Sequence, residues 1–260
     1  MHYTIQGRGP ALIFVHGWAM HGGVWAGMAE ELSRDFQTVA VDLRGHGGSR
    51  DMGGPFTYEA CAGELLELAG RISEEPVTAI GWSMGVSILL ACCRLRPEAF
   101  SRLVFISGNP SLVARDGYDC GIPEITVRRL YGQVARRYPG GLEAFYKLLL
   151  TDSELERFGR DQLYLAAIDP AMAPAREAAL ESLSCLMRED LRESVPSVAR
   201  PTLILHGEED AICAPSAAAY LHGRIAGSRL AMLAGAGHMP FLTRRLEVAA
   251  HLREFLESPP

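Results

Sequence analysis

The sequence predicts an α/β fold, in which a mostly parallel central sheet carries helices on both faces and a helical cap is inserted between two strands. Two observations lead to this prediction. Short apolar runs recur along the chain, and each ends in a glycine or a polar turn, which is typical of strands buried on both faces. Segments with helical spacing lie between several of these runs, and such alternation favours a parallel sheet with right-handed crossovers.

Six apolar runs are expected to form the strands. They are Leu12–Val15, Thr38–Val41, Val77–Ile80, Leu103–Ile106, Thr202–Leu205 and Leu230–Leu233. Helices are expected between them, for example at Tyr58–Ile72 and Val86–Leu95. The alternation stops over residues 109–192, where Leu, Ala, Arg and Glu recur at helical spacing. Residues 1–108 and 193–260 should therefore form one core, into which residues 109–192 are inserted as the helical cap.

Length and composition narrow the class of protein. A chain of 260 residues suits one large domain, or a core with an insertion, better than two independent domains. Hydrophobic residues make up 48% and charged residues 22%, which is the balance of a globular protein rather than a disordered one. Because 31 acidic residues outnumber 25 basic ones, nucleic acid is not an expected partner.

Targeting and metal-binding patterns are not evident in the sequence. The first ten residues, MHYTIQGRGP, lack the basic region and apolar run of a signal peptide, and no apolar stretch approaches the roughly 20 residues of a membrane span. The six cysteines form no CxxC pair, so neither zinc nor a disulfide framework is expected. We therefore expect a cytoplasmic protein with reduced thiols, no metal, no cofactor and no membrane partner, with a monomer as the default state.

A nucleophilic serine is indicated by the motif Gly81-Trp82-Ser83-Met84-Gly85, between a predicted strand and a predicted helix. In a sharp strand-to-helix turn the central residue has a strained backbone, and the residues two positions before and after it must be very small. Such a turn lifts the Ser83 hydroxyl out of the carboxyl edge of the sheet. The alternative is an ordinary Gly-Ser turn.

A serine hydroxyl is a poor nucleophile unless a base lies within hydrogen-bond reach. Among the eight histidines, His238 follows the last predicted strand in the loop GAGHMPF. Its glycines would let the loop bring the ring back over Ser83. His16 and His206 instead end predicted strands, where structural roles are more typical. His238 is therefore the predicted base.

The base needs a carboxylate that fixes its tautomer. Asp210 lies just beyond the fifth predicted strand, and Glu208 and Glu209 are rivals in the same loop. The alternative position, beyond the fourth predicted strand, offers Gly108 and Asn109 and no acid. Asp210 is the preferred candidate, because the order serine, aspartate, histidine along the chain is a known one for this chemistry.

A developing oxyanion needs preorganised N–H donors. The backbone N–H of Met84 is one candidate, and that of Trp18, after the first predicted strand, is the other. Core packing is an alternative role for the rings of Trp18 and Trp82, and it is compatible with a role for the backbone. A substrate pocket is expected between core and cap. Its candidate lining residues are Trp18, Trp82, Phe145 and Met239.

The first helix of the insertion should have one apolar and one basic face. At 100° per residue one arc contains Val127, Leu130, Tyr131, Val134 and Tyr138. The opposite side contains Arg128, Arg129, Arg136 and Arg137. This basic face is a local exception in an acidic chain, and it is either solvated surface or a docking site.

On these residues the sequence resembles the α/β-hydrolase superfamily over essentially its whole length. The matching pieces are HGW at 16–18, DLRGHG at 42–47, GWSMG at 81–85, Asp210 and His238. The resemblance implies a serine hydrolase that works through an acyl-enzyme without metal or cofactor. Residues 42–47 are expected to form a structural turn. Ser83 argues against dehalogenases and epoxide hydrolases, which have aspartate at this position.

A narrower resemblance is to the pimeloyl-acyl carrier protein methyl ester esterases of biotin synthesis. It rests on HGW followed by Val24-Trp25, on GWSMG, and on ARDGY at 114–118. It implies a carboxylesterase acting on a pimeloyl methyl ester attached to an acidic carrier protein, which cap arginines hold. This sequence has no arginine at 140–144, where that family has them, so the basic face described above would take their place.

Other functions remain open at this stage. A general short-chain carboxylesterase and a carbon–carbon hydrolase or lyase use the same fold with a similar serine site, and fold alone does not separate them. A non-catalytic ligand receptor built on the same scaffold is a third possibility, although the intact serine, histidine and aspartate set argues against it.

Overall fold

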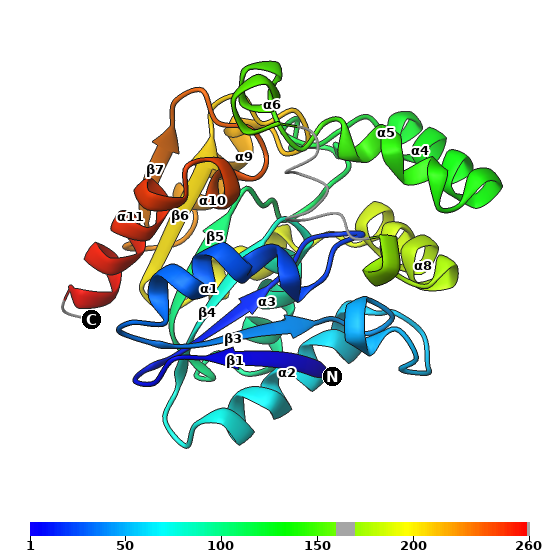
Figure 1. Ribbon diagram of the computed structural model, residues 1–260. Coiled ribbons are helices and arrows are strands. Elements are labelled where there is room, and N and C mark those ends of the chain that lie inside the picture. The colour runs from blue at the N-terminus through cyan, green and yellow to red at the C-terminus, as the bar shows by residue number, and fades with distance from the viewer. Residues whose placement is uncertain (160–169, 259–260) are drawn as a thin grey trace.

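The computed structural model describes residues 1–159 and 170–258, and this part of the chain is built around one seven-stranded sheet (Figure 1). The strands are β1 (His2–Gln6), β2 (Ala11–Val15), β3 (Gln37–Asp42), β4 (Val77–Trp82), β5 (Phe100–Ile106), β6 (Thr202–Gly207) and β7 (Arg229–Leu233). Their order is β1-β3-β2-β4-β5-β6-β7. β1 is antiparallel to β3, and the other neighbouring strands pair in parallel.

All six predicted strands are confirmed, whereas β1 is an additional strand that was not predicted. The residues of β1 are all exposed, and the side chains of Tyr3 and Ile5 are 37% and 44% exposed. An antiparallel edge strand does not need two buried faces, so it lacks the apolar run by which the others were recognised.

The helices of the core surround the sheet. They are α1 (Ala26–Leu32), α2 (Tyr58–Ile72), α3 (Met84–Leu95), α9 (Pro215–His222), α10 (Pro240–Thr243) and α11 (Arg245–Glu257). α1 packs on α11 and α2 packs on α3, and the two pairs lie on opposite faces of the sheet (Figure 1). The prediction of α2 is confirmed with the same bounds, whereas α3 begins two residues earlier than predicted.

Local sequence explains where α2 begins and ends. The hydroxyl of Thr57 accepts a hydrogen bond from the backbone N–H of Ala60 at 3.1 Å, which caps the helix. Glu59 lies in the first turn and Arg71 in the last, so both charges complement the helix dipole. The buried face of the helix then packs on α3 behind the serine motif.

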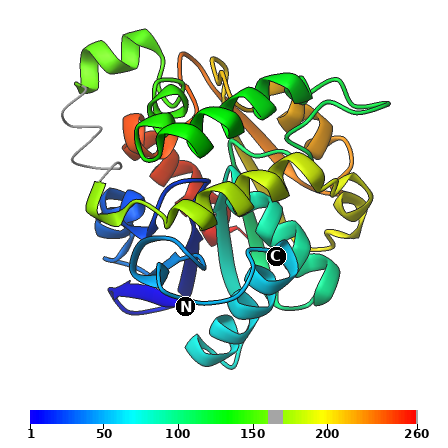
Figure 2. The ribbon, with the colours of Figure 1, turned by 90° about the vertical axis from the view of Figure 1, so that its right-hand side faces the viewer.

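Between β5 and β6 the described residues form helices and contribute no strand to the sheet. The helices are α4 (Glu124–Arg137), α5 (Glu143–Tyr146), α6 (Asp152–Phe158) and α8 (Arg176–Arg188). They lie together beyond the carboxyl ends of the central strands, where α4 and α8 run side by side (Figures 1 and 2). Residues 160–169 of the predicted cap lie outside the described residues.

Short 3-10 helices are also present among the described residues. They lie at Gly22–Trp25, Gly47–Ser49, Gly140–Leu142, Pro170–Met172 and Arg192–Ser197. Residues 42–47 form the expected structural turn, because the carboxylate of Asp42 accepts hydrogen bonds from the backbone N–H groups of Gly22 at 2.6 Å and Gly48 at 2.9 Å.

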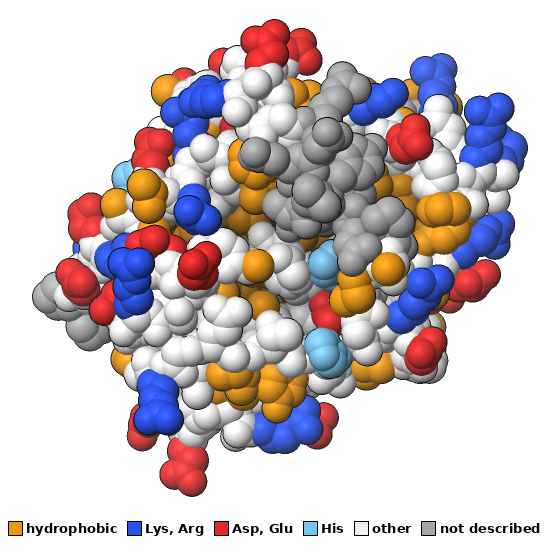
Figure 3. Space-filling view, in the orientation of Figure 1, with side chains coloured by type: hydrophobic (Ala, Val, Ile, Leu, Met, Phe, Trp, Pro, Cys, Tyr) orange, Lys and Arg blue, Asp and Glu red, His pale blue; other side chains and the backbone are white. Residues whose placement is uncertain are grey.

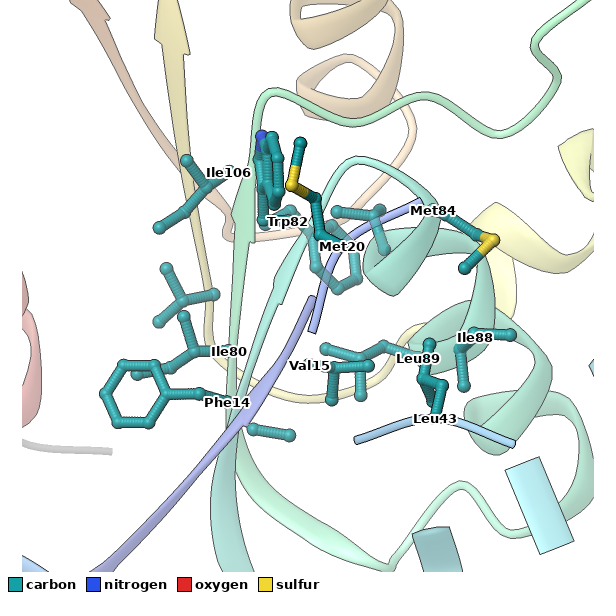
Figure 4. Close-up of a cluster of buried hydrophobic side chains, with 14 of the residues drawn as sticks. Phe14, Val15, Met20, Leu43, Ile80, Trp82, Met84, Ile88, Leu89 and Ile106 are labelled. Carbon is teal, nitrogen blue, oxygen red and sulfur yellow. The ribbon is translucent and has the colours of Figure 1, made fainter. Parts of the chain in front are cut away.

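The serine motif stands on a close-packed apolar base. Phe14 of β2, Ile80 of β4 and Leu89 of α3 are fully buried and belong to one cluster (Figure 4). Burial of each such side chain contributes about 1.5–3 kcal/mol to stability. The strand and the helix on either side of Ser83 are therefore held firmly by the core.

All six cysteines are free thiols, and five of them are buried, while Cys120 is partly exposed. Burial raises the pKa of Cys93 to about 12, so this thiol stays protonated. In the described part of the chain, no helix combines the length and the apolar character that crossing a membrane requires.

Two buried histidines support the turn beneath the site. His16 Nε2 accepts a hydrogen bond from the backbone N–H of Leu43 at 3.0 Å, and its Nδ1 lies 2.8 Å from the carbonyl oxygen of Gly17. Burial, together with the charge of His46, lowers the pKa of His16 to about 3. Burial also lowers the pKa of His46 to about 4. Both rings are therefore neutral in the folded protein.

Stability should fall as the pH drops below 6.5. Both histidines titrate near 6.5 in the unfolded chain, so below that pH the unfolded state binds more protons than the folded state. The stability that the neutral rings contribute is present above pH 6.5 and is lost as the pH falls toward their folded-state pKa values. Each ring should lower the free energy of unfolding by about 1.4 kcal/mol between pH 7.5 and 5.5. Urea titrations at these two pH values measure the loss.

Two variants test whether the buried histidines cause this pH-dependent loss of stability. His46→Gln should show a smaller pH-dependent loss than the parental protein. His222→Gln, at an exposed ring, should show the full loss. Equal stability of the parental protein at both pH values would contradict the buried, neutral state.

Candidate active site

Ser83 occupies a strained turn between β4 and α3. Its backbone has φ 53° and ψ −119°, a conformation that residues with a side chain rarely adopt. A Cβ on Gly81 would lie 2.7 Å from the backbone of Gly85, and a Cβ on Gly85 would lie 2.3 Å from the carbonyl oxygen of Val15. The predicted need for glycine at both positions is thus confirmed by these contacts.

The structure brings Ser83, His238 and Asp210 together from three separate loops. Ser83 Oγ lies 2.9 Å from His238 Nε2, and His238 Nδ1 lies 2.8 Å from Asp210 Oδ2. The loops follow β4, β7 and β6, whose carboxyl ends meet at one edge of the sheet. The imidazole therefore bridges the hydroxyl and the carboxylate.

Asp210 is held as an ionised acceptor. Its Oδ1 accepts hydrogen bonds from the backbone N–H groups of Ile212 and Cys213, each at 2.9 Å. Burial by itself raises the pKa of this carboxyl, but the charge of His238, its hydrogen bond, and His206 outweigh burial and leave the pKa below its usual value. An ionised carboxylate only accepts, so the proton between it and His238 lies on Nδ1. Nε2 is then free to accept from Ser83.

The other candidates for the acid and the base lie in different surroundings. Glu208 and Glu209 are exposed, and neither is hydrogen-bonded to His238. Asn109 donates to the sulfur of Cys213 at 3.1 Å. His206 Nε2 lies 2.8 Å from the carbonyl oxygen of Cys213 and 3.3 Å from Asp210 Oδ2. It therefore supports the position of the carboxylate.

The backbone N–H groups of Met84 and Trp18 are the two predicted oxyanion donors. Met84 is the first residue of α3, so its N–H has no acceptor within the helix. The loop after β2 carries Trp18, and the described residues offer no hydrogen-bond acceptor to its backbone N–H. Both residues line the same cavity as Ser83. The Trp18 ring reaches the helices above, because its Nε1 donates to the carbonyl oxygen of Ala179 in α8 at 2.9 Å.

A cavity of about 310 Å³ opens in front of Ser83, between the sheet edge and the helices above it. Its walls are mainly apolar, and they include Leu112, Ile122, Leu130, Leu183, Leu186 and Ile212. Trp18 and Phe145 line it as predicted, with ring centroids 4.7 Å apart. The cavity therefore accommodates an apolar chain next to the serine.

Trp82 and Met239 do not line this cavity, so that part of the prediction is wrong. Both are fully buried. Side chains alternate between the two faces of a strand, and Trp82, next to Ser83, points into the core. Its Nε1 donates to the carbonyl oxygen of His238 at 2.8 Å, and its ring packs against Phe241. Trp82 thus supports the histidine loop.

The four arginines of α4 are exposed, as predicted, but their surroundings differ. Arg128 pairs with Glu124 one turn earlier, with Nε 2.7 Å from the carboxylate. Arg129 lines the cavity. Arg136 and Arg137 line a surface groove that also contains Lys147. Figure 3 shows basic side chains along the edge of the molecule where α4 lies. The predicted apolar arc is buried at Val127 and Val134, whereas Tyr131 is 37% exposed.

The surface groove and the cavity are neighbours. Gln133, Ala144 and Leu148 line both of them. These three residues therefore separate the cavity that contains Ser83 from the basic groove.

Glu154 was not among the predicted site residues. It is a buried carboxylate that contacts the histidine loop by accepting a hydrogen bond from the backbone N–H of Gly237 at 3.0 Å. The spacing Thr151-x-x-Glu154 is that of a capping box and predicts the start of α6. It carries no information about a contact 83 residues further along the chain.

The chain is similar to known proteins over almost its whole length. The model of the alpha/beta hydrolase family matches residues 12–251. A pimeloyl-[acyl-carrier protein] methyl ester esterase of Xanthomonas oryzae pv. oryzae is 33% identical over the full length of both chains. The protein with the same name from Nitrosomonas europaea is 32% identical over 94% of each chain. An esterase from Exiguobacterium antarcticum superposes with a TM-score of 0.88 at 25% identity, covering 99% of this chain and 95% of its own.

Proposed function

The chain belongs to the alpha/beta hydrolase family and is a serine carboxylesterase, and we propose that its substrate is the methyl ester of a pimeloyl chain carried on acyl carrier protein. The observation that carries the proposal is the hydrogen-bonded series Ser83–His238–Asp210 facing an apolar cavity. The ester itself is the one named for the full-length relatives. We propose, from the resemblance described above, that the reaction belongs to biotin synthesis.

The proposed reaction proceeds through an acyl-enzyme. Ser83 Oγ attacks the ester carbonyl while His238 Nε2 takes its proton, and the N–H groups of Trp18 and Met84 stabilise the oxyanion. The bond to the alcohol oxygen then breaks, and His238 donates the proton to the leaving methoxide. A water molecule attacks the acyl-enzyme with His238 again as base, which releases the acid and restores Ser83.

The surroundings of the site support a long, carrier-bound acyl group. The apolar walls suit methylene groups, and the basic groove begins at the rim of the cavity. Arg136, Arg137 and Lys147 would attract an acidic carrier protein to that groove. In this proposal residues 109–192 act as the cap that covers the acyl chain, and the exposed Arg128 and Arg129 of the same helix are further candidates for contact with the carrier.

Hydrolysis of the carrier-bound methyl ester should be far faster than that of simple esters. The measurement compares kcat/KM for pimeloyl-carrier protein methyl ester with that for para-nitrophenyl esters from acetate to decanoate. Arg136→Glu and Arg137→Glu should each raise KM for the carrier substrate about tenfold, because they reverse a charge at the rim of the interface. The effect should shrink at high salt. Hydrolysis of para-nitrophenyl butyrate should not change.

The matched control is Arg8→Glu, at an exposed position between β1 and β2, which should behave as the parental protein with both substrates. Brisk cleavage of short esters without cleavage of the carrier substrate would contradict the proposed substrate. It would leave a general short-chain carboxylesterase.

A further inference from the structure

The backbone of His238 is attached on two sides. Its N–H donates to the carbonyl oxygen of Leu149 at 3.0 Å, and its carbonyl oxygen accepts from Trp82 Nε1 at 2.8 Å. Leu149 belongs to the helical segment between β5 and β6, whereas Trp82 ends β4. The backbone of the histidine is thus hydrogen-bonded both to the helical segment and to the sheet.

Glu154 adds a second attachment from the same helical segment. Its side chain is 1% exposed, and its carboxylate has three hydrogen-bond donors. Oε2 accepts from the backbone N–H groups of Thr151 and Gly237, each at 3.0 Å, and Oε1 accepts from the hydroxyl of Thr243 in α10. A buried carboxylate is costly unless it is hydrogen-bonded, so these donors determine where the side chain stays.

The contact with the histidine loop is close, and a side chain in place of Gly237 would crowd it. A Cβ on Gly237 would lie 2.8 Å from Glu154 Oε2 and 3.1 Å from the backbone nitrogen of Thr151. Because Gly237 directly precedes His238, the peptide group that joins them determines where the imidazole begins. The ring must then reach both Ser83 at 2.9 Å and Asp210 at 2.8 Å.

Helix capping alone does not account for this arrangement. In a capping box, the glutamate at the third helical position accepts only from the backbone N–H of the capping residue, here Thr151. The bonds to Gly237 and Thr243 are additional, and they join α6 to the loop after β7 and to α10.

We propose that Glu154 is a positioning residue, which holds the His238 loop against the helical segment so that the imidazole stays aligned between Ser83 and Asp210. The inference rests on the proposed role of His238 as the base. It assigns the helical segment a part in catalysis besides covering the substrate.

Kinetics of three variants test the proposal with para-nitrophenyl butyrate. Glu154→Ala should lower kcat about 10- to 100-fold and change KM less than about threefold, because a small displacement of a catalytic group has an effect of this size. Glu154→Gln should keep kcat within about threefold. Its amide oxygen can accept from both N–H groups, and its amide nitrogen can donate to the Thr243 hydroxyl.

Thr151→Ala is the matched control, since it removes the capping hydroxyl and leaves the bond between Glu154 and Gly237 in place. It should lower stability while kcat stays at the parental value. If Glu154→Ala does not fold, Glu154→Asp replaces it, because this variant keeps the charge but is one methylene too short to reach Gly237. The same fall in kcat is expected.

A spectroscopic measurement reports on the histidine directly. The proton between His238 Nδ1 and Asp210 should give a downfield proton NMR signal that shifts or broadens in Glu154→Ala and not in Thr151→Ala. Parental kcat with an unchanged signal in a folded Glu154→Ala, or equal losses of kcat in both variants, would overturn the proposal. A failure of the proposed function would look different, because the parental protein itself would then show no Ser83-dependent turnover.

Discussion

Replacement of Ser83 by alanine should remove ester hydrolysis, with kcat falling about 10⁶-fold, because no other side chain forms the acyl-enzyme. The fold should persist, since the turn depends on Gly81, Gly85 and the packing of β4 and α3 rather than on the hydroxyl. Kinetics with para-nitrophenyl butyrate and thermal unfolding measure the two effects separately.

Ser83→Gly is a useful companion variant. Glycine adopts a positive φ without strain, so this variant should be as inactive as Ser83→Ala and more stable by about 1 kcal/mol. Substantial residual activity in either variant would show that another group performs the attack.

Replacement of Asp210 by asparagine should lower kcat about 10⁴-fold. The neutral amide no longer stabilises the imidazolium. It can also donate to His238 Nδ1, which would leave the proton on Nε2 and prevent that atom from accepting from Ser83. Because the pKa of the parental carboxyl lies below its usual value, the parental protein should keep this carboxylate charged throughout pH 5–9. The measurement is kcat at pH 8 for both proteins.

Glu209→Gln is the matched control, since Glu209 is an exposed carboxylate directly before Asp210. It should retain parental activity. If Glu209→Gln lost activity and Asp210→Asn kept it, the assignment of the acid would be wrong.

Most of the fold could be predicted from local sequence patterns. An apolar run of four residues implies a strand, and six such runs form β2 to β7. β7 lies at an edge of the sheet and is only partly buried, unlike the central strands. The helix α2 could be predicted as directly, because helical spacing repeats within the segment itself. β1 could not be predicted in this way, because its five exposed residues form no such run. Its place in the sheet depends on pairing with β3.

The sequence alone was sufficient to select Ser83, His238 and Asp210. Each follows a predicted strand, and the carboxyl ends of parallel strands meet at one edge of a sheet. Residues far apart in the chain could therefore be expected to come together. The two glycines around Ser83 marked the turn, because contacts of 2.3 and 2.7 Å leave no room for a Cβ there.

The neighbours that support the site depend on tertiary packing. It turned Trp82 into the core, placed Arg129 on the cavity wall and Arg136 on the groove, and brought Glu154 to Gly237. Periodicity reports which face of a helix or strand is buried, but not which distant element buries it. The contact between α6 and the histidine loop depends on how two segments pack across the sheet edge, and packing at that distance leaves no repeat in the sequence.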